Sequence, residues 1–181
     1  YPDIQIFLKV VDDTYVTMLE ENIIDMAFIL DVPLVNSSVN TIVEIKEEIG
    51  LFSTLEHSLS KKKKVVLNDV SNIPMLLTTK ECCYRKLFEE ELKQKEITPK
   101  MILETSNLQA IKEMTINGVG ICLLPQLAVE KEIEEKKLIK LAYTTNYKIS
   151  SQLIMHKDKW ISPILKNFLD IIKVFSEEFE K

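Results

Sequence analysis

Residues 104–125, ETSNLQAIKEMTINGVGICLLP, constrain the fold of this chain more than any other stretch. Ser106 followed three residues later by Gln109 predicts a capping box, because a hydroxyl and an amide side chain can both satisfy free backbone N–H groups at a helix start. Apolar residues at helical spacing follow, and Gly118 predicts the left-handed residue that ends the helix. Residues 119–124 are a continuous apolar run of strand length. The segment therefore predicts a strand–helix–strand unit in a parallel sheet.

The same alternation of strand and helix patterns runs through the rest of the chain. Residues 14–22 predict a helix with one apolar face, and residues 24–30 predict an apolar strand after it. Thr78 and Glu81 form a second capping-box pattern ahead of a helix with an apolar stripe. Pro163 predicts the first turn of a last helix. Alternating strands and helices indicate an α/β fold with a parallel-rich sheet and helices on both of its faces.

Charge and composition exclude several classes of protein. The net charge of −5 argues against a duplex DNA surface on this chain, because such a surface needs an excess of basic residues to neutralise phosphates. No window approaches the roughly 20 uninterrupted apolar residues of a membrane-spanning helix, and the given residues contain no charged start followed by an apolar core and a small-residue cleavage site, so no secretion signal is expected. Three cysteines with no metal-type spacing favour a reducing compartment, so we expect a cytoplasmic protein without metal or cofactor.

The order of these motifs resembles the effector-binding domain of LysR-type transcriptional regulators. The resemblance covers nearly the whole chain and departs from the family pattern at Asn22, where Gly is usual, and at Cys83, where a small Ser is expected. The departure at Asn22 is compatible with the pattern because Asn, like Gly, tolerates the left-handed conformation at a helix end. The matching segments are Tyr1-Pro2-Asp3 with the alternating Ile4, Ile6, Leu8 and Val10, residues 24–29 (IDMAFI), residues 74–85 with the run CCYR, and the G-x-G-x-x-x-L-P pattern within residues 104–125.

The resemblance implies two Rossmann-like lobes of the periplasmic-binding-protein type 2 kind, joined by two crossover strands. Lobe I would comprise residues 1–73 and 149–181, and lobe II residues 74–148. The opening alternation at residues 4–10 would be a strand. The family's first strand and helix, its linker helix and its winged helix-turn-helix domain would normally precede Tyr1, so the sequence is expected to be part of a longer regulator.

By the same resemblance the chain would sense a small cytoplasmic effector, more specifically an anionic metabolite such as an organic or amino acid. The effector would bind between the lobes and favour one arrangement of them by its differential contacts. A homodimer or a higher homo-oligomer is expected, and in the dimer the helix over residues 14–22 would pack against lobe II of its mate. DNA would be contacted only through the helix-turn-helix domain, and no membrane contact is expected.

The candidate effector-binding residues follow predicted strands, where ligands of open α/β sheets gather. Helix starts there present free N–H groups and partial positive charge. Alternatively, Thr78 and Ser106 only cap their helices. The candidates are Thr78, Thr79 and Lys80 after one strand of lobe II, Thr105, Ser106 and Asn107 after the next, and Val32 and Pro33 in lobe I.

Other reactive side chains allow two interpretations each. Cys82 and Cys83 are predicted in the first turn of a helix, where a thiol pKa falls and a redox sensor can form, but a small buried pair packed on the sheet is the favoured reading. Arg85 could pair with an anionic effector, although an ion pair with a Glu of the same or a neighbouring helix is favoured.

Two other functions compete with an effector sensor. A solute-binding protein of a transport system shares the two-lobe architecture and would carry a secretion signal or lipid anchor. An enzyme on the same fold would need a catalytic residue, and the sequence offers no catalytic motif around its two histidines and no phosphate loop. We therefore expect no enzymatic activity.

Overall fold

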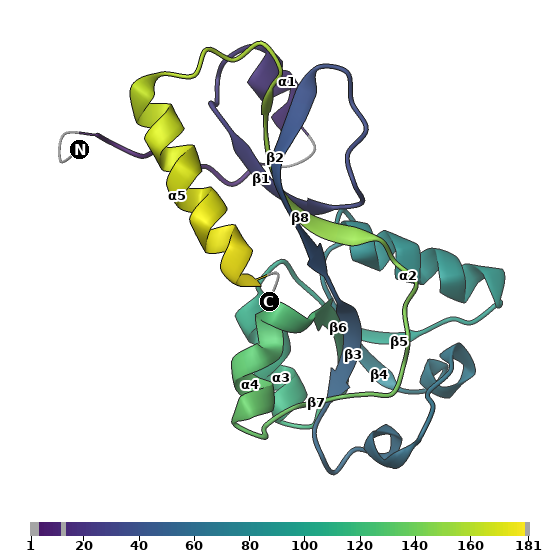
Figure 1. Ribbon diagram of the computed structural model, residues 1–181. Helices are drawn as coiled ribbons and strands as arrows, with labels where there is room; N and C mark the ends of the chain where they lie inside the picture. The colour runs from purple at the N-terminus through teal and green to yellow at the C-terminus, as the bar shows by residue number, and fades with distance from the viewer. Residues whose placement is uncertain (1–3, 12–13, 180–181) are drawn as a thin grey trace. The chain divides into compact units, whose positions relative to one another are not determined.

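The computed structural model describes residues 4–11 and 14–179, and the chain forms two compact units (Figure 1). The first unit combines the described residues up to Lys46 with those from Ser150 onward, and the second runs from Glu47 to Ile149. The second unit thus begins well before residue 74, where the expected lobe II starts. The cause is strand β3 (Ile49–Ser53), which pairs with strand β6 (Ile121–Pro125) of the second unit.

The chain passes from the first unit to the second in strand β2 (Val39–Glu47) and returns in strand β8 (Ile149–His156). The remaining elements are α1 (Tyr15–Glu20), β1 (Ala27–Asp31), η1 (Ser58–Lys61), η2 (Leu67–Val70), β4 (Pro74–Leu77), α2 (Cys83–Gln94), β5 (Lys100–Glu104), α3 (Leu108–Ile116), η3 (Gln126–Val129), α4 (Glu130–Glu134), β7 (Ile139–Lys140) and α5 (Pro163–Phe179).

The first unit is a three-stranded sheet in the order β1-β8-β2 with apolar clusters on both faces. Neighbouring residues of a strand point to opposite faces. Ile154 therefore packs with Leu19 of α1, whereas Leu153 packs with Leu169 of α5. β8 is buried along almost its whole length because helices cover both of its faces.

Two predictions for the first unit have different outcomes. The expected strand over residues 4–10 is wrong, because these residues have no regular structure and no sheet partner. Leu8 and Val10 are almost fully exposed as a result. Asn22 does take the left-handed conformation, with φ 56°, as expected from its place after α1. Tyr1-Pro2-Asp3 of the family pattern lies outside the described residues.

The second unit contains a five-stranded sheet in the order β5-β4-β6-β3-β7. β5 and β6 both pair parallel with β4, which lies between them, whereas β3 pairs antiparallel with β6 and β7. The predicted strand–helix–strand unit is therefore present as β5, α3 and β6, with another strand inserted between its two strands. In Figure 1, α3 and α4 lie on one side of this sheet and α2 lies on the other.

Two glycines between α3 and β6 explain why the chain can turn so sharply. Gly118 has φ +73°, and its N–H donates to the Thr115 carbonyl while the Val119 N–H donates to the Met114 carbonyl. This pair of bonds is the Schellman arrangement that ends a helix. Gly120 lies so close to β4 that an added Cβ would be 2.3 Å from the Pro74 carbonyl oxygen.

Candidate functional site

The carboxyl ends of β4 and β5 lie side by side, as expected for parallel neighbours. Leu77 is paired with Glu104, and the Thr105 N–H donates to the Leu77 carbonyl oxygen at 3.2 Å. Thr78 and Thr105, the first residues after the two strands, therefore lie at the same edge of the sheet. We call residues 78–80 and 105–107 the β4/β5 edge.

Most side chains of the β4/β5 edge are accessible, but Thr78 is not. Lys80, Ser106 and Asn107 are exposed, and Thr79 and Thr105 are half-buried. Thr78 is only 5% exposed, and its hydroxyl oxygen has no hydrogen-bond partner in the described part of the chain. A buried hydroxyl without a partner costs free energy, so this oxygen is a notable polar atom beneath an accessible edge.

The start of α3 differs from the predicted capping box. Asn107 is the cap, and its side-chain oxygen accepts a hydrogen bond from the Ala110 N–H at 3.1 Å. The Thr105 hydroxyl in turn accepts from the Asn107 N–H at 3.1 Å. Gln109 does not reach back but donates to Glu113 at 2.9 Å. The Ser106–Gln109 prediction is wrong because the turn made by Thr105 delays the helix by one residue.

The start of α2 also lies later than predicted. The helix begins at Cys83 with Cys82 at its N-cap position, so the Thr78–Glu81 capping box is wrong. Thr78 follows the buried strand directly, and a turn closed by the Cys82 N–H on the Thr79 carbonyl separates it from the helix. The Glu81 carboxylate instead accepts hydrogen bonds from its own backbone N–H and from the Thr79 hydroxyl. Both bonds lower the pKa of Glu81, and the backbone bond lowers it more.

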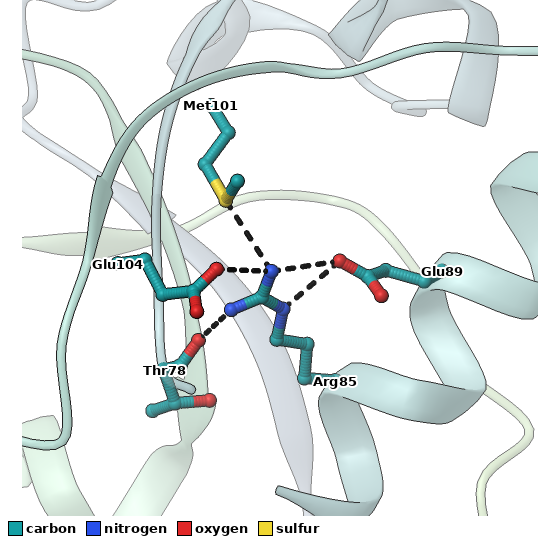
Figure 2. Close-up of polar contacts among 5 residues, drawn as sticks. All are labelled: Thr78, Arg85, Glu89, Met101 and Glu104. Atoms are coloured by element: carbon teal, nitrogen blue, oxygen red, sulfur yellow. Dashed lines mark hydrogen bonds and ion pairs between the residues drawn. The ribbon is translucent and has the colours of Figure 1, made fainter. Parts of the chain in front are cut away.

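Arg85 joins the elements that form the β4/β5 edge (Figure 2). Its side chain is completely buried and forms ion pairs with Glu89 of α2 at 2.9 Å and with Glu104 of β5 at 2.8 Å. The guanidinium also donates to the Thr78 carbonyl oxygen and lies against the Met101 sulfur. The expected pairing with a Glu of the same helix is present, whereas the strand partner Glu104 was missed.

This arrangement decides what Arg85 can do. Burial lowers its pKa, but the hydrogen bonds and charges of Glu104 and Glu89 act in the opposite direction, and the net effect is a raised pKa. Two carboxylates compensate the single positive charge of the guanidinium. Arg85 therefore fixes α2 to the ends of β4 and β5 and is not available as a free cation for a ligand. The sequence signal that could have indicated the burial of Arg85 is that apolar residues flank it on the same helix.

The three cysteines lie in different surroundings. Cys82 is half-buried, and its pKa is lowered to about 6. The largest cause is a hydrogen bond from Cys83. Thr78, Tyr84 and the Arg85 backbone N–H lower the pKa further, whereas burial raises it. Cys122 is fully buried in β6, and burial raises its pKa to about 12. The expectation that Cys122 belongs to the core is confirmed.

Val32 and Pro33 belong to the first unit and are exposed directly after β1. The buried Gln152 of β8 holds this turn: its amide nitrogen donates to the Val32 carbonyl at 3.0 Å, and its amide oxygen accepts from the Leu34 N–H at 2.9 Å. Nothing in the local sequence pattern indicated Gln152 as the residue that shapes the turn. The role of Val32 and Pro33 in effector binding stays a prediction.

Two features are absent from residues 4–11 and 14–179. No helix there is both long and apolar enough to cross a bilayer. No group of three or more His, Cys, Asp or Glu side chains in the same residues is placed to hold a metal ion.

Two α/β units connected by two strands, with polar residues gathered at the carboxyl ends of parallel strands, are features of a ligand-binding domain. Residues 1–175 match the family model described as the LysR substrate binding domain. The chain therefore belongs to the LysR substrate-binding domain family.

Relatives of known sequence agree with this assignment. The HTH-type transcriptional regulator YwqM of Bacillus subtilis (strain 168) is 31% identical over 175 residues, which cover 96% of this chain and 59% of that protein. A probable nitrogen assimilation transcriptional activator of Synechococcus elongatus is 22% identical over 129 residues, which cover 70% of this chain and 42% of that protein. The chain thus spans only about half the length of these relatives.

Solved structures share the fold at low sequence identity. The regulatory domain of Synechocystis PCC6803 CcmR in complex with 2-PG has a TM-score of 0.75 at 18% identity and covers 97% of this chain and 85% of its own. The apo regulatory domain of HypT from Salmonella typhimurium has a TM-score of 0.73 at 17% identity, and the match covers 94% of this chain and 81% of the HypT chain. The effector-binding domain of QuiR in complex with shikimate has a TM-score of 0.69 at 17% identity, covering 91% and 78%. The expected periplasmic-binding-protein type 2 fold is confirmed.

Proposed function

We propose that this chain is the effector-sensing domain of a LysR-type transcription regulator and that the β4/β5 edge contacts the effector. The observation that carries the proposal is the Thr105 N–H bond to the Leu77 carbonyl, which brings residues 78–80 and 105–107 to one edge. Ligands of open α/β sheets bind outside the carboxyl ends of the strands. Membership of the LysR substrate-binding domain family supports a ligand rather than a structural role for this edge.

The chemistry of the edge favours a small polar anion. Lys80 is exposed and has no ion pair among the described residues, and Thr105 and Ser106 add hydroxyl groups that can donate to a carboxylate. The positive end of the α3 dipole points to the same edge. Arg85 does not contribute because Glu89 and Glu104 neutralise it. QuiR and CcmR were solved with shikimate and with 2-PG, and by analogy we extend small-molecule binding to this chain.

The wider roles of the regulator are also part of the proposal. The names of the relatives support a cytoplasmic regulator that contacts DNA through a helix-turn-helix domain. A homodimer, with α1 packing against the second unit of the partner, follows from the family resemblance. Light scattering that gives a monomer mass at high concentration would count against this dimer. We propose no enzymatic activity, and the family assignment favours a regulator over a transport protein.

A thermal-shift screen of anionic metabolites tests the effector site. An effector present at 100 times its Kd stabilises the folded state by about 2.7 kcal/mol, which a melting experiment resolves easily. We expect the shift to fall strongly in Lys80→Gln and in Ser106→Ala. The matched controls are Lys64→Gln and Ser58→Ala, which change exposed residues elsewhere in the same unit. Equal shifts in all four variants would show that the effector binds elsewhere.

A further inference from the structure

Two tyrosine hydroxyls hold the segment by which the chain leaves the second unit. The Tyr143 hydroxyl donates to Glu91 Oε2 of α2 at 2.8 Å, and the Tyr147 hydroxyl donates to the same oxygen at 2.7 Å. Tyr143 is buried, and its ring packs edge-on against Phe88 of α2 with the ring centres 6.3 Å apart. We call Glu91, Tyr143 and Tyr147 the Glu91 clasp. Hydrogen bonds to a carboxylate are stronger than bonds between neutral groups, so the clasp fixes this segment to α2.

The clasp lies directly before a strand that connects the two units. Residues 143–148 form no helix or strand, and Tyr147 comes two residues before Ile149, the first residue of β8. β8 continues into the first unit, where the Ser150 hydroxyl donates to Glu44 of β2 at 2.8 Å. A change in the clasp therefore reaches the start of β8 along the chain, and it reaches β2, the other connecting strand, through Ser150.

The start of the same helix lies at the β4/β5 edge. Arg85, in the first turn of the 12-residue helix α2, fixes it to the ends of β4 and β5. Glu91 lies about 9 Å further along the helix axis, at 1.5 Å per residue. Tyr84, Phe88 and Glu91 follow one another at helical spacing and share a face of α2. A helix of this length moves as one body, so a displacement at its start also displaces Glu91.

We propose that the Glu91 clasp is a regulatory device that couples the β4/β5 edge to strand β8. The inference rests on the proposed effector site for its input. An effector at the edge contacts the start of α2 and shifts the helix, and the clasp passes that shift to the start of β8. Coupling between sites needs an element with two arrangements, which here are the made and the broken clasp. Because both hydroxyls share one oxygen, a displaced carboxylate weakens both bonds together.

Hydrogen exchange tests the coupling without any effector. Lys86→Gly weakens α2 at an exposed position, and the matched control Glu113→Gly weakens α3 to a similar extent. We expect Lys86→Gly to raise the exchange rate of residues 144–152 at least about threefold and Glu113→Gly to leave it unchanged. In Tyr143→Phe/Tyr147→Phe the rate is already raised, and adding Lys86→Gly changes it by less than about 1.5-fold. Equal responses to the two glycine variants, or a full response without the clasp, overturn the proposal.

Variants of the acceptor separate the clasp from a general loss of stability. Glu91→Leu removes the shared oxygen, whereas Glu91→Gln keeps an oxygen that can accept from the hydroxyls. Thr145→Val is the matched control, because it removes a bond of 3.0 Å from the same segment to the Ile49 carbonyl and leaves the clasp intact. We expect the exchange response to Lys86→Gly to disappear in Glu91→Leu and to persist in Glu91→Gln and Thr145→Val. Persistence in Glu91→Leu, or loss in Thr145→Val, overturns the role of the clasp.

A bound metabolite separates the clasp from the effector site. The probe is the metabolite with the largest shift in the thermal-shift screen, and exchange of residues 149–156 is measured with and without it. We expect Tyr143→Phe/Tyr147→Phe to bind within about threefold of the parent Kd but to lose at least about half of the change in exchange. Lost binding, or an unchanged exchange response, overturns the clasp and leaves the effector site standing. If no metabolite binds, the effector site fails, and the glycine variants alone decide whether the clasp couples α2 to β8.

Discussion

Arg85 Nη2 lies 2.8 Å from Glu104 Oε2 and thereby connects helix α2 to the end of strand β5. The same guanidinium donates to the Thr78 carbonyl at the end of β4 (Figure 2). One buried side chain therefore holds both strand ends from which residues 78–80 and 105–107 emerge.

Arg85→Met should destabilise the second unit by about 2–4 kcal/mol. Removing one partner of a buried ion pair is costly, but Glu89 and Glu104 have side chains 38% and 35% exposed, so water can hydrate them after the change. Arg85→Lys should also lower the free energy of unfolding by more than about 1 kcal/mol, because an ammonium group cannot bond to Glu89, Glu104 and the Thr78 carbonyl in the planar geometry of a guanidinium. Urea unfolding measures both variants. A loss below about 0.5 kcal/mol in Arg85→Met would mean that the link is not structural.

Gly120→Ala should cost at least about 2 kcal/mol, because the new Cβ would lie 2.3 Å from the Pro74 carbonyl oxygen and would push β6 away from β4. Gly118→Ala is the matched control: its Cβ would meet no atom within 4 Å, so only the left-handed φ of +73° is unfavourable. That strain is about 1 kcal/mol. Thermal unfolding should give Gly120→Ala a clearly lower melting temperature than Gly118→Ala. The reverse order would contradict the close approach of Gly120 to Pro74.

Asn107→Ala should destabilise the protein by about 1 kcal/mol, because the side chain accepts the Ala110 N–H bond at the start of α3. Ser106→Ala should change stability by less than about 0.5 kcal/mol, since Ser106 is exposed and precedes the cap. Chemical unfolding of the two variants distinguishes this cap from the predicted capping box. A larger loss in Ser106→Ala would restore the original prediction.

Tyr143 and Tyr147 both donate to the same Glu91 oxygen, at 2.8 and 2.7 Å. Hydrogen bonds to charged groups are strong, so each Tyr→Phe change should cost about 1–2 kcal/mol, and the losses should not add because the acceptor is shared. Urea unfolding of the single and double variants measures this coupling. Simple additivity within about 0.3 kcal/mol would argue against a shared acceptor.

The same pair predicts how stability responds to alkaline pH. Burial, followed by hydrogen bonding to Glu91, raises the pKa of both Tyr143 and Tyr147 above the ordinary value of 10.0. A raised pKa in the folded state favours the protonated form, so this contribution is complete below pH 10 and is lost as pH rises above it. The free energy of unfolding should therefore fall more steeply above pH 10 in the parent than in Tyr143→Phe/Tyr147→Phe. Identical slopes would show that neither pKa is raised.

Local sequence patterns predicted those helices, strands and turns that depend on residues close together in the chain. The strand–helix–strand unit, the stop at Gly118 and the left-handed Asn22 all depend on residues within one or two turns of each other. Hydrophobic spacing and backbone conformational limits act over that same range. The family motifs added the two-unit architecture, which periodicity alone does not contain.

Tertiary contacts decided the features that local patterns could not reach. Whether residues 4–10 form a strand depends on a neighbouring strand to pair with, and a strand without one leaves its N–H and C=O groups unpaired. Arg85 could be placed beside Glu104 only by the parallel pairing of β4 and β5, and the orphan Thr78 hydroxyl is visible only once burial is known.

The chain thus indicated by itself most of its helices and strands, because those preferences arise within a few residues, but not whether residues 4–10 would find a strand to pair with. Only the folded structure decided which polar side chains meet at the β4/β5 edge and which are buried there, because residues distant in the sequence supply the partners and exclude the water.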